Sequence, residues 1–327
     1  MQTRLRRSWI YFSLFTFPFS LGYCCANAQQ YPSKPVRIVV PYAPAGPVDE
    51  VARLLGQRLT ESLGGPVIVD NRAGAGGGIG TDAVAKAPPD GYTLLIGNSG
   101  PMTINPALHK KIPYDPQKDL TPVTLLLAGQ MVLAVHPSLP ARSVKDLVVL
   151  ARARPGQINF GSIGVGNLTH LAMELFQSTA KIRMNHVPYK GAAPAYVDLI
   201  AGNIEVLMSN IAGTVPQLKG GRLRAVAVSS AKRAKVLPEV PAIAETYPGY
   251  DLTTWMGVFA PTGTPQPIVT RLHGDMVKAL QRPDFRERVE AQGSEILAAP
   301  ASELAALVNR ETKLYANIIK TAGIPPQ

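Results

Sequence analysis

The sequence predicts an α/β fold with two lobes, in which each lobe is a mainly parallel β-sheet flanked by helices. Two observations lead to this prediction. Short apolar runs alternate with helical patterns along most of the chain, and this β-α-β order is typical of parallel sheets with helices on both faces. The alternation occurs in two units of similar layout, and a length of 327 residues suits two domains.

The first unit starts with the apolar run 36–40, which predicts a strand, and continues into a helix from about Val48. Apolar residues of this helix recur with the 3.6-residue spacing of one buried face, and a pair of glycines ends it. Further strands are predicted at 66–69 and 92–97. Between them lie a glycine-rich turn and a short helix that two prolines stop.

The second unit begins with the apolar segment 123–137, which predicts one or two strands. A helix follows from Ser143, whose hydroxyl can cap free backbone N–H groups, with Asp146 three residues later. Strands and helices then alternate again. Strands are predicted at 158–160, 184–189, 204–210 and 223–230, and helices at 168–180 and 194–202.

The C-terminal part has a different pattern. The stretch 253–261 contains two aromatic residues and predicts a strand. Segments 267–280 and 302–320 have the apolar stripe of amphipathic helices, which must cover a sheet face. Periodicity alone leaves open which lobe these two helices cover.

The first 28 residues have the composition of a secretory signal peptide. A basic head precedes the mostly apolar run 9–23 and a small-residue site, so we expect cleavage after Ala28. A membrane anchor is the alternative, but the apolar run is shorter than the roughly 20 residues that span a bilayer. Both cysteines, Cys24 and Cys25, lie in this segment, so the mature chain has no thiol. Lipidation of either cysteine stays open, although the residue before Cys24 is bulky for a lipoprotein site.

The charge of the mature chain is moderately basic. Loss of the leader removes three arginines and lowers the formal net charge from +11 to +8. Such a protein can attract anions. Its basic residues are scattered and lack an aromatic platform, so no nucleic-acid partner is expected. No second apolar stretch is long enough to cross a membrane, so we expect a soluble mature protein.

Motifs of common enzymes are missing from the sequence. It has no G-x-S-x-G nucleophile elbow, no G-x-G-x-x-G dinucleotide fingerprint and no phosphate-binding P-loop. The five histidines show no H-x-x-x-H spacing, so neither a metal site nor a cofactor is expected. A Ser/His/Asp triad assembled from distant segments stays open, and a secreted α/β hydrolase is therefore the alternative from another functional class.

Three turns that follow predicted strands share a chemistry suited to anions. They cover residues 41–49, 98–105 and 161–170 and combine glycine with hydroxyl or amide side chains, and the first and third lead directly into helices. A helix start exposes backbone N–H groups with partial positive charge, which can hold a carboxylate or phosphate. One glycine-rich turn alone would indicate only a tight bend. Three turns at equivalent strand ends favour a binding site, because ligands of α/β sheets bind there.

The candidate ligand-binding residues come from these turns and from a neighbouring strand end. They are Tyr42, Ala43, Ala45, Gly46, Val48, Asp49, Asn98, Ser99, Ser162, Gly164, Gly166, Thr169, His170, Tyr189 and Lys190. Several have an ordinary structural alternative. Asp49 can cap the helix at Val51. Ser162 and Thr169 can be satisfied locally, and His170 is expected to be a structural hydrogen-bonding residue. Lys190 can pair with an acidic ligand, whereas most lysines are merely solvated.

Five stretches together carry a family resemblance. They are YPSKPVRIVVPYAPAGPVDEVARLL, VIVDNRAGAGGGIGTDAVAKAPPDGYTLLIGNSG, NFGSIGVGNLTHLAMELF, VPYKGAAPAYVDLIAGNIEV and TTWMGVFAPTGTP. Their combination and order resemble the substrate-binding proteins of tripartite tricarboxylate transporters, also called Bug proteins. The resemblance extends from about Tyr31 to the C-terminus.

The resemblance implies a periplasmic protein with the two-lobed Venus-flytrap fold. By analogy, residues 29–129 and 254–327 form lobe 1, residues 130–253 form lobe 2, and both tail helices belong to lobe 1. Members of the family bind small organic acids in the cleft, largely through backbone groups and water. Their ligands include di- and tricarboxylates, acidic amino acids and aromatic carboxylates.

Departures from the family pattern bear on the ligand. In the first turn Ala45 stands where a glycine is common, which narrows the allowed backbone, and Val48 replaces a common hydroxyl residue. Many members have Phe-Asp-Asn where this chain has Met208, Ser209 and Asn210, so a carboxylate partner for a ligand amine is lost. Ser209 and Asn210 join the candidate residues. We expect a ligand less polar than aspartate or citrate, such as an aromatic or aliphatic carboxylate.

The sequence thus favours a monomeric receptor that closes on a small carboxylate and serves the permease of a tripartite tricarboxylate-type transporter. A ligand-sensing module for a membrane sensor uses the same closed state, so the sequence leaves this alternative open. Neither interpretation involves an enzyme, a cofactor, a metal or nucleic acid.

Overall fold

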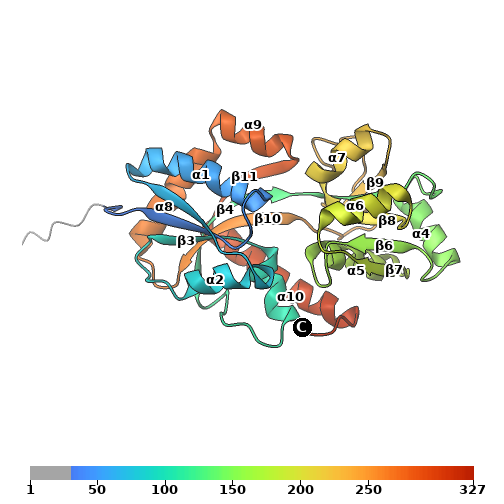
Figure 1. Cartoon of the computed structure of the whole chain (residues 1–327), viewed down its shortest axis with the longest axis horizontal. Coiled ribbons are helices and arrows are strands. Elements are labelled where there is room, and N and C mark those ends of the chain that lie inside the picture. Colours follow the sequence, from blue (N-terminus) through green and yellow to red (C-terminus); the bar gives the residue numbers. More distant parts are fainter. Residues whose placement is uncertain (1–30) are drawn as a thin grey trace, which may run out of the picture. The chain divides into compact units, whose positions relative to one another are not determined.

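The first β-sheet of the computed structural model has six strands (Figure 1), and the structure describes residues 31–327. In spatial order they are β11 (Ser294–Pro300), β4 (Leu120–Gly129), β10 (Thr254–Pro261), β3 (Thr93–Asn98), β1 (Val36–Val40) and β2 (Val67–Asn71). β1 pairs in parallel with β2 and β3, whereas β10 and β4 run antiparallel to their neighbours. The predicted signal peptide, with Cys24 and Cys25, lies outside the described residues.

The second sheet has five strands. In spatial order they are β7 (Asn185–Pro188), β6 (Asn159–Ser162), β8 (Val206–Asn210), β5 (Met131–Val135) and β9 (Arg224–Val228). β6 pairs in parallel with β7 and β8, and β5 runs antiparallel to β8 and β9. The prediction of two α/β sheets is confirmed. Both sheets are mixed rather than mainly parallel, because β10, β4 and β11 of the first sheet and β5 of the second pair antiparallel with their neighbours.

The chain changes sheets at Gln130. β4 ends at Gly129, which pairs with Thr254 in the first sheet, and β5 begins at Met131, which pairs with Asn210 in the second. β10 brings the chain back into the first sheet at Thr254. Residues 32–327 pack as one compact unit, so the lobe boundaries at 129/130 and 253/254 remain an interpretation of sheet membership.

Helices cover both faces of the first sheet (Figure 1). α1 (Pro47–Leu63) and α8 (Gln266–Leu280) lie on one face, and α2 (Gly78–Ala85) and the first half of α10 (Ala301–Thr321) lie on the other. α1 buries its predicted apolar stripe and ends at Gly64 in the left-handed conformation. Shorter segments complete this part: η1 (Ala75–Gly77), the π-helical turn η2 (Gly100–Ile104), α3 (Asn105–Leu108) and α9 (Pro283–Ala291).

The second sheet is also covered on both faces. Its helices are α4 (Val144–Ala153) and α5 (Leu168–Ala180) on one face, and α6 (Ala192–Ala201) and α7 (Ile211–Lys219) on the other, with the short η3 (Ile243–Glu245) nearby. Alternate residues of β5 face opposite cores, since Leu133 packs with α4 and α5 while Val132 packs with α6 and α7. The predicted cap of α4 is confirmed, because Asp146 N donates to Ser143 Oγ at 3.1 Å.

α10 contributes to both cores. Leu304 and Val308 pack beneath the first sheet, whereas Tyr315 and Ile318 belong to the cluster formed with α4 and α5 of the second sheet. The analogy assigns α10 to the first lobe, and the second half of this helix also reaches the core of the second sheet. A helix of 21 residues is about 30 Å long, which is enough to extend beyond one sheet face.

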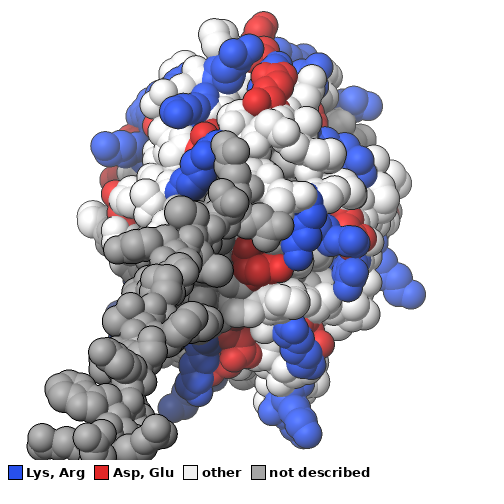
Figure 2. Space-filling model, turned by 90° about the vertical axis from the view of Figure 1, so that its left-hand side faces the viewer, with Lys and Arg blue, Asp and Glu red and all other residues white. Residues whose placement is uncertain are grey.

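The surface of the described chain has two further properties. None of the helices in residues 31–327 combines the length and the hydropathy needed to cross a bilayer. On the face shown in Figure 2, Lys and Arg side chains are interspersed with Asp, Glu and uncharged residues. This face lacks the basic stripe that is typical of nucleic-acid-binding proteins.

Candidate functional site

The predicted turns follow the carboxyl ends of strands in the two sheets. These two sets of strand ends, called the sheet edges below, meet where the chain changes sheets. In the first sheet the carboxyl ends of β1 and β3 are neighbours, and Asn98 lies beside the start of β10. In the second sheet the ends of β6, β7 and β8 are neighbours, and Asn210 pairs with Met131. Gln130 alone separates Met131 from Gly129, which pairs with the start of β10. The candidate residues of the two sheets are therefore brought to adjacent edges.

Tyr42 joins the turn after β1 (residues 41–46, the β1 turn) to the end of β3. Its hydroxyl donates to Asn98 Oδ1 at 2.8 Å, and Gly100 N donates to the same oxygen at 3.2 Å. Burial raises the pKa of Tyr42 to about 12, so the phenol stays protonated. Tyr42 and Asn98 thus hold two of the predicted turns together.

Asp49, on the first turn of α1, organises the β1 turn. Its Oδ2 accepts from Ala45 N and Arg53 Nε, each at 2.9 Å, and its Oδ1 accepts from Asn71 Nδ2 at 2.9 Å. Asn71 Nδ2 also donates to Tyr42 O at 3.1 Å. Burial alone would raise the pKa of Asp49, but the bonds from Arg53, Ala45 and Asn71 outweigh it and hold the pKa below its ordinary value. Asp49 therefore has a structural role, and it engages the Ala45 N–H.

The tip of the β1 turn presents mostly backbone. Ala43 and Ala45 are exposed, Gly46 is half-buried, and the Val48 side chain is buried. The first intrahelical bond of α1 runs from Glu50 N to Gly46 O at 3.0 Å, so the Val48 N–H precedes it and has no acceptor within the helix. Ala45 has a φ of +65°, the left-handed conformation that glycine favours. Ala45 thus adopts a glycine-type backbone, at a cost of about 1–2 kcal/mol.

The turn after β6 (residues 163–167, the β6 turn) is closed by local side chains. Ile163 N donates to Thr169 Oγ1 at 3.1 Å. Asn167 caps α5, because its Oδ1 accepts from Thr169 N at 3.1 Å. Thr169 is buried, and its hydrogen bonds are made within the turn, which is the structural role given above as an alternative to ligand binding. Asn167 was not among the candidate residues, although its place directly before a helix is the usual signal of a cap.

Gly166 fixes the middle of the β6 turn. Its N–H donates to His170 Nδ1 at 3.1 Å, so this ring nitrogen must be unprotonated, and His170 has the structural role expected for it. Gly166 has a φ of +71°, and a β-carbon at this position would lie 2.3 Å from the side chain of Leu108 in α3. The β6 turn therefore contacts the other part of the molecule through a residue whose backbone and close contact favour glycine. Gly164 also has a positive φ, of +136°.

His186 of β7 was not singled out by the sequence, yet it supports the same turn. Its ring stacks on His170 with centroids 3.7 Å apart, and its Nε2 lies 2.7 Å from Ser162 Oγ. Ser162 Oγ also lies 3.1 Å from Gly164 O. Burial, together with the neighbouring His170, lowers the pKa of His186 to about 4. His186 is therefore neutral at physiological pH, and Ser162 is satisfied locally.

The Ser162–His186 contact has the distance of a nucleophile–base pair but not its other properties. Ser162 has no exposed surface. Within residues 31–327 no carboxylate is bonded to His186, and a pKa near 4 makes this ring a weak base at neutral pH. The described chain also has no group of three or more His, Cys, Asp or Glu placed to hold a metal ion. The arrangement does not support the hydrolase alternative.

The remaining candidates lie at the ends of β7 and β8. Tyr189 N donates to Ser162 O at 2.9 Å, which attaches Tyr189 to the start of the β6 turn. Lys190 and Asn210 are exposed, whereas Ser209 is buried. In the part of the chain that the structure describes, Lys190 forms no ion pair, so its ammonium group is available to an anion.

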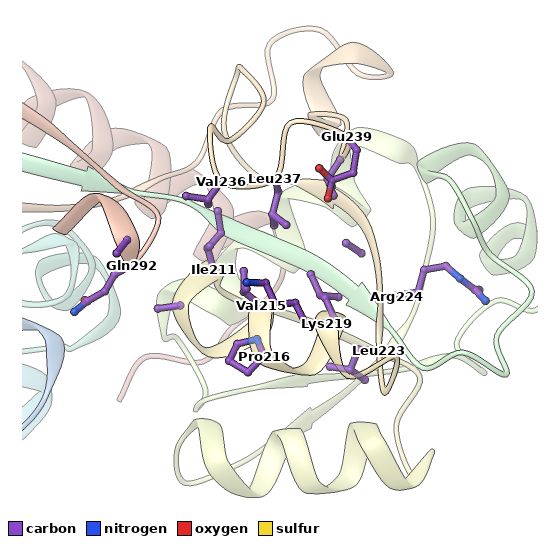
Figure 3. Close-up of a pocket in the computed structure, with 15 residues that line it drawn as sticks. Ile211, Val215, Pro216, Lys219, Leu223, Arg224, Val236, Leu237, Glu239 and Gln292 are labelled. Atoms are coloured by element: carbon purple, nitrogen blue, oxygen red, sulfur yellow. The ribbon is translucent and has the colours of Figure 1, made fainter. Parts of the chain in front are cut away.

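A cavity of about 920 Å³ lies beside α7 (Figure 3). It is lined mainly by apolar residues of α7, β9 and the segment 236–240, with Gln292 at its border. None of the candidate residues lines it. The candidate site is thus defined by the strand ends and not by this cavity.

Comparisons with known proteins agree with this architecture. Residues 51–324 match the family model described as "Tripartite tricarboxylate transporter family receptor". The protein BugT of Bordetella pertussis is 38% identical over 299 residues, which cover 91% of this chain and 92% of that protein.

Solved structures share the fold over nearly the whole described chain. An R. palustris protein with adipate is 36% identical, covers 91% of this chain and 100% of its own, and has a TM-score of 0.79. The periplasmic binding protein BugD is 34% identical with the same coverage and a TM-score of 0.75. MatC from Rhodopseudomonas palustris with bound malate is 32% identical, covers 88% of this chain and 100% of its own, and has a TM-score of 0.75. The predicted binding-protein fold is therefore confirmed.

Proposed function

Because this chain belongs to the tripartite tricarboxylate transporter receptor family, we propose that it binds a small organic acid between its two sheets. The family consists of periplasmic solute-binding receptors, and solved relatives hold adipate and malate. The function requires no covalent chemistry. The two sheet edges bind the acid and close on it, and the closed form is what a membrane partner recognises.

The observation that supports this proposal best is the meeting of the two sheet edges at Gln130. One edge offers the β1 turn and the start of α1, and the other offers the β6 turn, the start of α5 and Lys190. Backbone N–H groups at a helix start attract carboxylates. An acid held at this meeting point can engage both edges at once. The hydrogen bond between Tyr42 and Asn98 shapes the first edge, and Asn71 links Asp49 to Tyr42.

We propose that the ligand is less polar than aspartate or citrate. The β1 turn offers few polar groups, because Ala43 is apolar, Val48 is buried and the Ala45 N–H is engaged by Asp49. Ser209 and Asn210 bring no charge for a ligand amine. An aliphatic or aromatic carboxylate fits these groups, since only its carboxylate needs polar partners.

A thermal-shift screen followed by calorimetry tests the function. The panel is adipate, benzoate, malate, citrate and aspartate. At 100 times its dissociation constant a ligand adds about 2.7 kcal/mol of stability, which raises the melting temperature by several degrees at roughly 2–4 °C per kcal/mol. We expect the largest shift with adipate or benzoate. Tight binding of only aspartate or citrate contradicts the ligand class, and hydrolysis of an ester without any shift contradicts the receptor function.

Lys190 provides the sharpest variant for the same screen. We expect Lys190→Ala to weaken binding of the preferred acid roughly tenfold, the loss of one charge-assisted hydrogen bond. Lys145→Ala is the matched control, because Lys145 is an exposed lysine on α4. Equal affinity of the two variants contradicts a ligand-side role for Lys190.

We also propose that the chain is exported, with residues 1–28 removed, and acts as a monomer with lobes of residues 29–129 plus 254–327 and 130–253. The partner of its closed form is a membrane permease, or a sensor protein that uses the same state. Mass spectrometry of periplasmic protein tests the export, with an expected N-terminus at Gln29. A lipid-modified chain beginning at Cys24 or Cys25 contradicts it.

A further inference from the structure

Glu311 is a buried acid at the junction of the two cores. It lies on α10 between Val308, which packs beneath the first sheet, and Tyr315, which packs in the core shared with the second sheet. Only 5% of its surface is exposed. A change in the charge of Glu311 therefore acts on both halves of this helix.

The groups around the Glu311 carboxyl are uncharged. Trp255 Nε1 donates to Oε2 at 2.7 Å, and Thr103 Oγ1 lies 3.4 Å from the same oxygen. Ser99 and Tyr315 lie beside the carboxyl, and both hydroxyls are buried. In residues 31–327 no Lys, Arg or His forms an ion pair with Glu311. Burial of a carboxylate without a counter-ion is costly, so this environment favours the protonated acid.

The titration of Glu311 is separate from that of its neighbours. Burial raises the pKa of Glu311 to about 7, against smaller opposing effects that include the bond from Trp255 and the charge of Arg310. Burial also raises the pKa of Tyr315 and of Tyr250 above the ordinary value, so both phenols stay neutral. The other ionisable groups on elements packed against α10 face partners of their own, namely His170 with Glu174 on α5, and Glu295 of β11 with Lys235. β4 and α3 carry no ionisable side chain.

Glu311 lies directly behind the candidate site. Ser99, beside the carboxyl, follows Asn98 at the end of β3, and Trp255 follows Thr254, where the chain re-enters the first sheet. An ionised Glu311 places a negative charge behind the edge that is to hold a carboxylate. A protonated Glu311 removes this repulsion.

We propose that Glu311 is a proton-binding site and that the receptor holds its carboxylate ligand together with a proton on Glu311. The proton site stands on the geometry of the buried carboxyl, and its linkage to the ligand rests on the proposed function. Linkage is reciprocal, so ligand binding favours proton uptake and the affinity for the acid falls as pH rises.

Trp255 reports on the proton site without any ligand. The chain has two tryptophans, and Trp9 lies in the segment that we propose is removed, so the mature protein starting at Gln29 has Trp255 alone, with its indole bonded to Glu311. We expect its fluorescence to change in one transition near pH 7, and the transition to be absent after Glu311→Gln, which keeps the acceptor oxygen. Glu303→Gln, an exposed acid on the same helix, is the control and should keep the transition. A chain with Glu311 intact that shows no transition between pH 5.5 and 8.5 overturns the proton site, even if the Gln variant fails to fold. An unchanged transition in the Gln variant also overturns it.

Adipate then tests the linkage. If ligand binding raises the pKa of Glu311 by one unit, the dissociation constant of adipate rises about tenfold between pH 6 and pH 9, and Glu311→Gln removes this dependence. The same pH dependence in both proteins overturns the linkage and leaves the receptor function intact. Failure of adipate to bind at any pH contradicts the proposed ligand class and the linkage together, while the fluorescence titration still decides the proton site.

Discussion

The β1 turn and the β6 turn occupy equivalent places in the two sheets but are held in different ways. The β1 turn depends on a charge, because Asp49 gathers bonds from Ala45, Arg53 and Asn71. The β6 turn depends on two stacked rings, because His170 accepts from Gly166 and stacks on His186. Both arrangements fix the backbone of their turn. They differ in what disrupts them: loss of a charge in the first, gain of a charge or of a side chain in the second.

The largest effect is expected from Gly166→Ala in the β6 turn. Its β-carbon would meet Leu108 at 2.3 Å in a backbone with φ +71°. Overpacking and left-handed strain together should cost about 2–4 kcal/mol. Gly156→Ala is the matched control, because Gly156 has a φ of +75° and open space around it, and should cost only about 1 kcal/mol. Equal losses for the two variants in urea unfolding would show that the contact with Leu108 is unimportant.

Asp49→Asn in the β1 turn should cause the next largest loss of stability. The amide keeps the size of the side chain but loses the charge that holds Arg53, at a cost of about 1.5–3 kcal/mol at pH 7. The native pKa of Asp49 is lowered, so its contribution is present above the unfolded pKa and is lost as pH falls through the folded one. The gap between the two proteins should therefore close in acid, below about pH 4. Glu50→Gln, an exposed neighbour, should lack both effects, and a gap that persists in acid argues against a role for the charge.

His186 should make the stability of the β6 turn depend on pH in a higher range than Asp49 does. Its pKa is about 4 in the fold against an ordinary 6.5, so the unfolded chain binds a proton first, and stability falls as pH drops from 6.5 to 4. Allowing for partial exposure, we expect a loss of about 2 kcal/mol across this window. His186→Gln should flatten the curve, whereas His109→Gln should not. A wild-type curve that is already flat between these pH values contradicts the assignment.

The fold could be predicted where periodicity and end signals agree. α1 and α5 have clear apolar stripes, and β1 and β3 are short apolar runs. α7 was missed because it contains Pro216, and α9 because it buries little besides Phe285 and Val289. β11 is an edge strand with an irregular register and Ala298 at φ +48°. These elements form because neighbouring segments cover them, which a local pattern does not encode.

The site was predicted as a set of turns but not as a set of contacts. Glycine, proline and helix-start residues mark the turns in the sequence itself. Asn71 and His186 support them from strands far along the chain, and only the fold brings these side chains to Asp49 and Ser162. Glu311 meets Trp255 in the same way, from the last helix. The sequence therefore predicts which turns can offer backbone groups to a ligand. It predicts less well which side chains hold those turns in place.

The smallest effect, and the test closest to the family pattern, is Ala45→Gly in the β1 turn. Ala45 already has φ +65°, so glycine should relieve strain without changing the turn. The relief is partly offset by the greater freedom of glycine in the unfolded chain, and we expect a net gain of up to about 1 kcal/mol in urea unfolding. Ala43→Gly, at an exposed position without a positive φ, should give no gain. Because the Ala45 N–H stays engaged by Asp49 in either case, the affinity for the preferred acid should remain unchanged. A large change in affinity would instead show that the residue at position 45 selects the ligand.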